Sequence, residues 1–267
     1  MTRCKRVLAL LLMPSCLLTG CALRSDKLAD GAGLSVQAQA DAQKRADIRL
    51  QLATAYYAAA QFPVAVAEAA EALRAVPDLA EAYSVRALAY AALGQTAQAE
   101  NDFRHSLKLM PGNPDFANNF GWFLCGEAAG VRAAEAIPYL EQAANNAAYR
   151  SPARALVNAG ACSLRVGDGL AAQRYFIRAF QYEPASAVTN LHLSKLYFDQ
   201  AEFERAQFHL GLAAKNEVLK VDALWLAIRI ERKLGNQAAE NDLAVQLRRR
   251  YPSSPEYAAY QRGAFDE

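Results

Sequence analysis

Cysteine and histidine are the side chains of this sequence that could act as nucleophiles or metal ligands. The three histidines, His105, His192 and His209, have no second ligand at the spacing that a metal site requires. The motifs HExxH and GxSxG and the phosphate-binding P-loop are absent. We therefore expect a protein that is not an enzyme, with no metal, no cofactor and no small-molecule substrate. The alternative is an enzyme with a dispersed site, which would show as a pocket of clustered carboxylates or histidines.

A basic segment followed by an apolar one opens the chain. Arg3, Lys5 and Arg6 precede an almost entirely apolar run over residues 7–18. This run is too short to span a bilayer, which takes roughly 20 residues, and the arrangement is typical of a signal peptide. Removal of residues 1–20 lowers the formal net charge from +2 to −1, because three positive charges leave with them. The mature chain then has no bulk electrostatic attraction to nucleic acid, and we expect no such partner.

Residues 18–21, LTGC, resemble the lipobox of bacterial lipoproteins. In that family the cysteine is acylated on sulfur and on its new amine, and more than one acyl chain gives stable anchoring. The resemblance implies lipidation of Cys21. Because Ala22 rather than aspartate follows, it also implies the outer membrane, with the protein on the periplasmic face. An ordinary signal peptide with a chance cysteine is the alternative.

Prolines recur at multiples of 34 residues in the rest of the chain. Pro77 and Pro111 are 34 residues apart, and Pro184 and Pro252 are 68 apart. This spacing resembles the tetratricopeptide repeat, in which helix A and helix B form an antiparallel hairpin. We predict an all-α right-handed superhelix, a solenoid of about six helix-turn-helix repeats; an irregular all-helical bundle is the alternative. The predicted N-terminal segments are a signal peptide (1–20) and a lipidated N-terminus (21–45), which consists of a tether to about residue 33 and a leading helix from about residue 35. The six predicted repeats are 46–79, 80–113, 114–152, 153–186, 187–220 and 221–254, and a C-terminal tail follows (255–267).

Small and large residues alternate between the two helices of each predicted repeat. Small side chains in helix A allow close approach of helix B, whose large residues fill the space between hairpins. Gly167 and Gly235 stand where helix A must end and turn. Repeat six departs from the pattern, because Glu240 replaces an expected alanine. The small positions are Ala53, Ala87, Gly121, Gly160 and Ser194, and the large ones are Phe103, Leu140, Phe176 and Leu210.

The A helices of such a solenoid line a concave groove. Apolar and aromatic residues at the inward positions suit a peptide or a helix as ligand. For Trp122 and Trp225, burial against neighbouring helices is an equal alternative. The predicted partner-binding residues are Leu50, Tyr57, Leu88, Trp122, Leu191 and Phe198.

Two cysteines remain in the predicted mature repeats. Cys125 lies near the end of helix A of repeat three, and Cys162 lies in helix A of repeat four. Adjacent A helices pack side by side, and an oxidising compartment favours disulfides. We expect a disulfide between them; two buried thiols are the alternative.

Residues 118–127 (NNFGWFLCGE) and 155–168 (ALVNAGACSLRVGD), with the lipobox and the repeats, resemble the type IV pilus biogenesis lipoproteins PilF and PilW. The resemblance implies a pilotin, an outer-membrane lipoprotein that binds secretin subunits and promotes their assembly. It also implies a partner surface in the early repeats, which here would include Leu50, Tyr57 and Leu88. Another periplasmic lipoprotein adaptor, serving outer-membrane protein insertion or cell-wall hydrolases, is the alternative.

Overall fold

The computed structural model describes residues 25–126, 132–215 and 218–265, and these form thirteen α-helices and no strand. The predicted signal peptide and Cys21 lie outside the described residues. The helices are α1 (Ser25–Ala58), α2 (Phe62–Ala75), α3 (Ala80–Ala92), α4 (Thr96–Leu109), α5 (Pro114–Gly126), α6 (Ala133–Ala144), α7 (Pro152–Arg165), α8 (Gly169–Tyr182), α9 (Ala187–Asp199), α10 (Phe203–Ala214), α11 (Val221–Lys233), α12 (Gln237–Arg250) and α13 (Pro255–Arg262).

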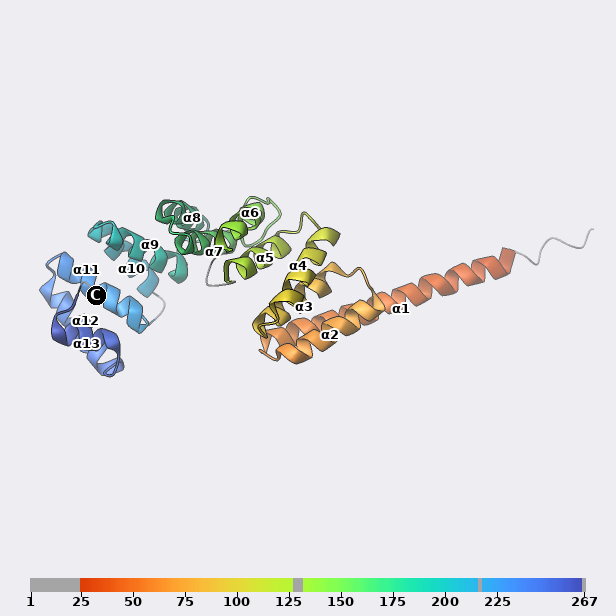
Figure 1. The fold of residues 1–267 in the computed structure, drawn as a ribbon, viewed down its shortest axis with the longest axis horizontal. Coiled ribbons are helices and arrows are strands. Elements are labelled where there is room, and N and C mark those ends of the chain that lie inside the picture. Colours follow the sequence, from red (N-terminus) through yellow and green to blue (C-terminus); the bar gives the residue numbers. More distant parts are fainter. Residues whose placement is uncertain (1–24, 127–131, 216–217, 266–267) are drawn as a thin grey trace, which may run out of the picture.

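Consecutive helices pair as antiparallel hairpins, and the hairpins follow a curved path (Figure 1). The predicted all-α solenoid is therefore confirmed. The odd-numbered helices from α3 to α11 begin within one residue of the predicted repeat starts. Those helix starts are Ala80, Pro114, Pro152, Ala187 and Val221.

The N-terminal helix is longer than the sequence indicated. Helix α1 begins at Ser25, inside the stretch expected to be an extended tether. Gly31 and Gly33 each disfavour a helix by about 1 kcal/mol, but extending an existing helix needs no new nucleation. At 1.5 Å per residue its 34 residues span about 50 Å. Its N-terminal part projects beyond the repeats (Figure 1).

Glycine at two helix A positions allows the hairpin to close. A Cβ atom on Gly121 would lie 2.7 Å from Cγ of Leu140. A Cβ atom on Gly160 would lie 2.7 Å from the ring of Phe176. Both large side chains are fully buried, so each fills the space that the glycine leaves.

The turn between helices A and B requires a left-handed residue. Gly94, Gly167 and Gly235 occupy it with φ between 72° and 81°, whereas Ala60 and Ala201 occupy it at φ 57° and 58°. This conformation is about 1–2 kcal/mol less favourable for an L-residue than the right-handed one. Glycine adopts it without that strain, although glycine also makes the unfolded chain more flexible.

Replacing these two alanines by glycine should therefore stabilise the fold. We expect Ala60→Gly and Ala201→Gly each to raise the free energy of unfolding by about 0.5 kcal/mol in urea titrations. The matched control is Ala55→Gly, an exposed position inside α1, which should lower it by about 1 kcal/mol. A lower free energy of unfolding for the two turn variants would contradict the prediction that Ala60 and Ala201 are strained in the left-handed conformation.

An ionic network joins α4 to the start of α6. Glu100 accepts hydrogen bonds from Arg132 (Nη1–Oε2, 2.8 Å) and from Arg104 (Nη2–Oε1, 2.7 Å). Arg132 also donates from Nε to Oε2 of Glu135 at 2.8 Å. The Arg132 bond, followed by that of Arg104, lowers the pKa of Glu100 to about 2. The network therefore links repeats two and three.

This network predicts a loss of stability in acid. The folded-state pKa of Glu100 lies below its unfolded value, so the stabilisation is complete above about pH 4.5 and disappears as pH falls towards 2. We expect a loss on the order of 1 kcal/mol, because solvent screens these partly exposed groups. The urea midpoint of Glu100→Gln should fall less between pH 5.5 and about pH 3 than that of the unchanged chain. Equal decreases would contradict the prediction.

Candidate functional site: two hollows on the inner face

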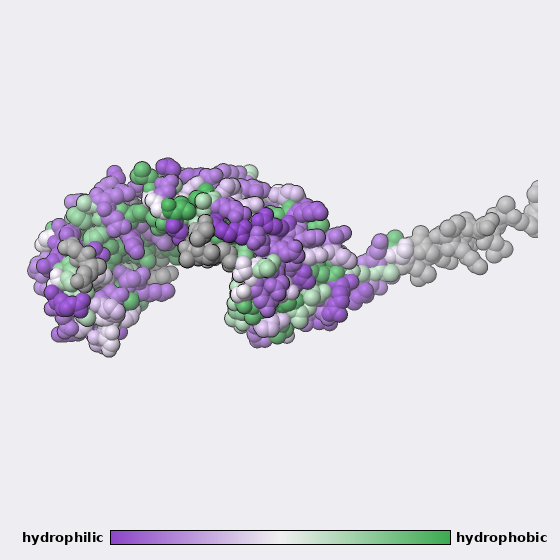
Figure 2. Space-filling model, viewed as in Figure 1, coloured by the Kyte–Doolittle hydropathy of each residue, from purple (hydrophilic) through white to green (hydrophobic). Residues whose placement is uncertain are grey.

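The inner face of the solenoid holds two hollows lined chiefly by A helices. Figure 2 shows the arched shape of the molecule, with hydrophilic residues over much of the face in view. The first hollow, of about 480 Å³, is lined by α1, α3, α5 and α7; the second, of about 520 Å³, by α7, α9, α11 and α13. The first is lined by Thr54, Tyr57, Val85, Leu88, Asp115, Asn118, Asn119, Trp122, Arg154 and Asn158. The second is lined by Leu164, Leu191, His192, Lys195, Leu196, Phe198, Asp199, Asp222, Trp225, Leu226, Arg229 and Glu256.

The first hollow combines apolar side chains with amides and one ion pair. Trp122 remains 46% exposed, although its neighbours in α5 are buried. Asn158 donates from Nδ2 to Oδ1 of Asn118 at 3.0 Å. Arg154 donates from Nη2 to Oδ1 of Asp115, also at 3.0 Å. An exposed indole beside oriented amides can bury apolar surface and accept polar contacts from a protein ligand.

The structure distributes the six predicted groove residues over different places. Tyr57, Leu88 and Trp122 line the first hollow, and Leu191 and Phe198 line the second. Leu50 lines neither: it is half-buried against a small core cluster of Ala46, Ala72, Leu73 and Ala82. The predicted groove residues thus divide between these two hollows, except for Leu50, which packs against the core of the first repeat.

The first repeat leaves apolar side chains uncovered. Ile48 and Leu52, one helical turn apart on α1, are both exposed. Among the described residues, no helix covers the side of α1 that carries these two side chains. Terminal repeats of solenoids normally carry a polar outer face. The first repeat therefore exposes apolar surface on α1 outside the first hollow.

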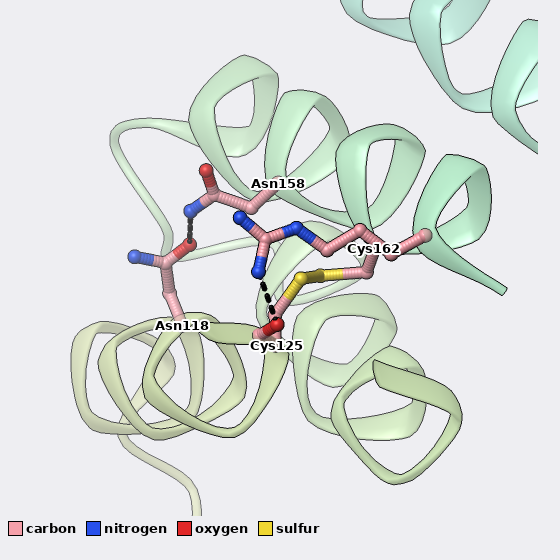
Figure 3. The surroundings of a disulfide bond; sticks show 5 residues. Asn118, Cys125, Asn158 and Cys162 are labelled. Atoms are coloured by element: carbon pink, nitrogen blue, oxygen red, sulfur yellow. Dashed lines mark hydrogen bonds between the residues drawn. A yellow bond between two sulfur atoms is a disulfide. The ribbon is translucent and has the colours of Figure 1, made fainter. Parts of the chain in front are cut away.

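The paired cysteines join α5 and α7, two of the helices that line the first hollow. In the structure Cys125 of α5 and Cys162 of α7 form a disulfide, with their Cα atoms 5.6 Å apart (Figure 3). Both residues are fully buried. Arg165 donates from Nη1 to the backbone oxygen of Cys125 at 2.6 Å, so α5 and α7 are joined at several levels. These links hold α5 against α7, and both helices contribute residues to the first hollow.

His192 of α9 and His209 of α10 pack against aromatic side chains. His192 stacks on Phe176, and Nδ1 of His209 lies 2.8 Å from Oδ1 of Asn190. Burial lowers the pKa of both histidines, which favours the neutral ring at pH 7. The described residues contain no group of three or more His, Cys, Asp or Glu side chains that could hold a metal ion. Within the same residues no helix has the length and apolar character needed to cross a membrane.

The paired helices, the small-to-large packing and the inner hollows define a tetratricopeptide-repeat protein. The family model described as tetratricopeptide repeat matches residues 80–113, which contain α3 and α4.

The chain is homologous to the type IV pilus assembly protein PilF of Pseudomonas aeruginosa. The two sequences are 25% identical over 215 residues, which cover 80% of this chain and 84% of that protein. The structure of PilF superimposes with a TM-score of 0.78, at 24% identity, over 84% of this chain and 99% of PilF. The crystal structure of PilW, described as a widely conserved type IV pilus biogenesis factor, matches with a TM-score of 0.72, at 29% identity, over 81% of this chain and 98% of PilW.

Proposed function

We propose that this protein is a lipid-anchored pilotin on the periplasmic face of the outer membrane, where it binds type IV pilus secretin subunits and promotes their assembly. The observation that supports this proposal best is the similarity to PilF and PilW over about four fifths of the chain, in sequence and in fold. The lipobox-like residues before Cys21 supply the anchor in this proposal. The protein acts as a binding scaffold and performs no catalysis.

Helix α1 gives the anchor a mechanical role in this proposal. It begins four residues after Cys21 and continues into the first repeat. A lipid at Cys21 would therefore tether the first hollow to the membrane through a long helical spacer. Holding secretin subunits close to a surface raises their effective concentration for assembly.

The first hollow is the proposed secretin-binding surface. It lies in the early repeats and contains the exposed indole of Trp122. Aromatic residues in concave surfaces commonly dominate binding energy. The proposed ligand is an apolar segment of the secretin.

Trp122→Glu should abolish secretin binding without unfolding the protein, because nearly half of the Trp122 surface already faces solvent. We expect at least about a 30-fold loss of affinity for purified secretin subunits by calorimetry, as for a typical interface hot spot. Tyr182→Glu is the matched control: Tyr182 is an exposed aromatic residue of α8 outside both hollows, and its replacement should leave affinity unchanged. Equal binding by Trp122→Glu would reject the first hollow as the secretin surface.

A further inference from the structure

One side of helix α1 carries an exposed stripe of residues with the spacing of a coiled coil. The intervals along it alternate between three and four residues, as do those between the contact positions a and d of a heptad. All six side chains are exposed, although coiled-coil positions normally face a partner helix. The residues of the stripe are Ala38, Asp41, Arg45, Ile48, Leu52 and Ala55.

The stripe runs from the first repeat onto the part of α1 that projects beyond the repeats (Figure 1). In the first repeat Ala46 and Ala53, on another side of the helix, are fully buried, whereas Ile48 and Leu52 are exposed. Residues 35–41 are all exposed, so this part of the helix has no covering partner among the described residues. The apolar half of the stripe thus needs a covering helix, and its other half belongs to a helix that covers nothing.

The charges of the stripe distinguish two ways of pairing α1 with a copy of itself. In an antiparallel pair with the two-fold axis beside residue 43, Asp41 of each copy faces Arg45 of the other, and Ala38 faces Ile48. In a parallel pair each residue faces its own counterpart, so that Asp41 meets Asp41 and Arg45 meets Arg45. Repulsion between like charges makes the parallel pair unfavourable. The charges therefore favour the antiparallel pair.

The surroundings of Arg45 also favour an incoming carboxylate. A shallow hollow of about 300 Å³ between α1 and α2 is lined by Arg45, Arg49, Glu71, Arg74 and Ala75. Arg49 pairs with Glu68 (Nη1–Oε2, 2.7 Å), and Arg74 pairs with Glu71. Among the described residues, Arg45 has no ion-pair partner in its own chain. This leaves one unbalanced positive charge beside the stripe, which Asp41 of a second copy would neutralise.

We propose that the stripe binds α1 of a second copy of this chain in an antiparallel pair, in which the projecting part of each helix covers Ile48 and Leu52 of the other. Two-fold symmetry forms each contact twice, so that the pair contains two Asp41–Arg45 ion pairs and two layers of Ala38 against Ile48. The stripe shares no residue with the first hollow, so both copies keep that hollow open. The proposal does not rest on the proposed function.

Disulfide cross-linking in intact cells tests the pair on the full chain, because a short helix pair gives a weak association that dilution would reverse. Two copies with different tags are produced together, one with Ala38→Cys and the other with Ile48→Cys, and a membrane-permeant thiol oxidant is added. We expect a linked species that contains both tags, at a yield at least about tenfold above that of two Ala38→Cys copies. Asp47→Cys in place of Ile48→Cys is the matched control, because Asp47 is exposed on another side of α1 and should give no link.

Exchange of the charges separates a specific pair from chance collisions. Asp41→Arg in both copies should lower the linked fraction at least about fivefold, because two arginines then meet in each charged layer. Asp41→Arg/Arg45→Asp in both copies should restore it to within about twofold, since each ion pair forms again with its signs reversed. Circular dichroism of the purified variants checks that each one folds.

Three results would overturn the proposal: no link between positions 38 and 48, an equal yield from two Ala38→Cys copies or from the Asp47→Cys control, or a yield that the charge exchanges do not change in this order. None of these results would bear on secretin binding by the first hollow, which the Trp122→Glu variant tests by itself.

Discussion

A chain with alanine in place of both Cys125 and Cys162 is expected to lose about 4 kcal/mol of unfolding free energy. The disulfide closes a loop with a sequence separation of 37 residues, and the chain-entropy relation gives about this value for such a loop at 25 °C. The stabilisation comes mainly from the unfolded chain, which the crosslink restrains. Because both sulfurs are buried, their removal also leaves a small void that adds to the loss.

The measurement is urea unfolding of protein prepared from an oxidising compartment. Reductant should lower the midpoint of the unchanged chain towards that of the double-alanine variant, and it should leave the variant unaffected. That second result separates the disulfide from any general effect of the reductant. A midpoint of the unchanged chain that is insensitive to complete reduction would contradict the prediction and would favour two packed thiols.

Arg86→Met is expected to destabilise the fold by about 3–5 kcal/mol, because it leaves the carboxylate of Asp102 buried without a partner. Arg86 donates to Asp102 from Nε at 2.6 Å and from Nη2 at 2.9 Å, joining α3 to α4. The Asp102 side chain is only 4% exposed. Hydrogen bonding to Asp102 also raises the pKa of Arg86, so the guanidinium stays charged.

The double variant Arg86→Met/Asp102→Leu should recover most of this loss, because it removes the buried charge together with its partner. Arg205→Met is the matched control: its pairing with Glu202 is solvent-exposed, and its removal should cost less than about 1 kcal/mol. Urea titration of the four chains measures all the values. A double variant as unstable as Arg86→Met would show that the buried charge is not the cause.

The repeat architecture could be predicted from the sequence because it depends on local signals. Proline ends helix B, small residues mark the closest approach of two helices, and both recur with a fixed period. Gly121 and Gly160 illustrate this, since their neighbours leave no room for a Cβ atom. Each repeat contacts mainly its neighbours, so the local pattern determines most of the fold.

The candidate site could be predicted only in part, because it depends on the curvature of the whole solenoid. Leu50 fits the inward pattern, yet it packs against the hairpin of the first repeat. Asn119 and Asn158 stand at equivalent positions of repeats three and four, a signal that would have placed both amides in the first hollow.

Polar pairs between neighbouring helices were also not predictable from the periodic pattern. Glu240 occupies a position where alanine was expected, and Arg232 from the preceding helix donates to it at 2.9 Å. Arg232 therefore gives the buried carboxylate of Glu240 a charged partner, which no repeat pattern would predict. The separation of the first hollow from the second also depends on the three-dimensional path of the A helices.

The central claim is that this protein assembles the secretin from a lipid anchor, and heat-stable secretin multimers in membrane fractions test it most directly. Cells that lack the gene should contain secretin monomers but no multimers, and should lose twitching motility. The unchanged gene should restore both, whereas Cys21→Ser should restore neither. Normal multimers and normal motility in the deletion strain would contradict the account, and a different lipoprotein adaptor would then be the better description.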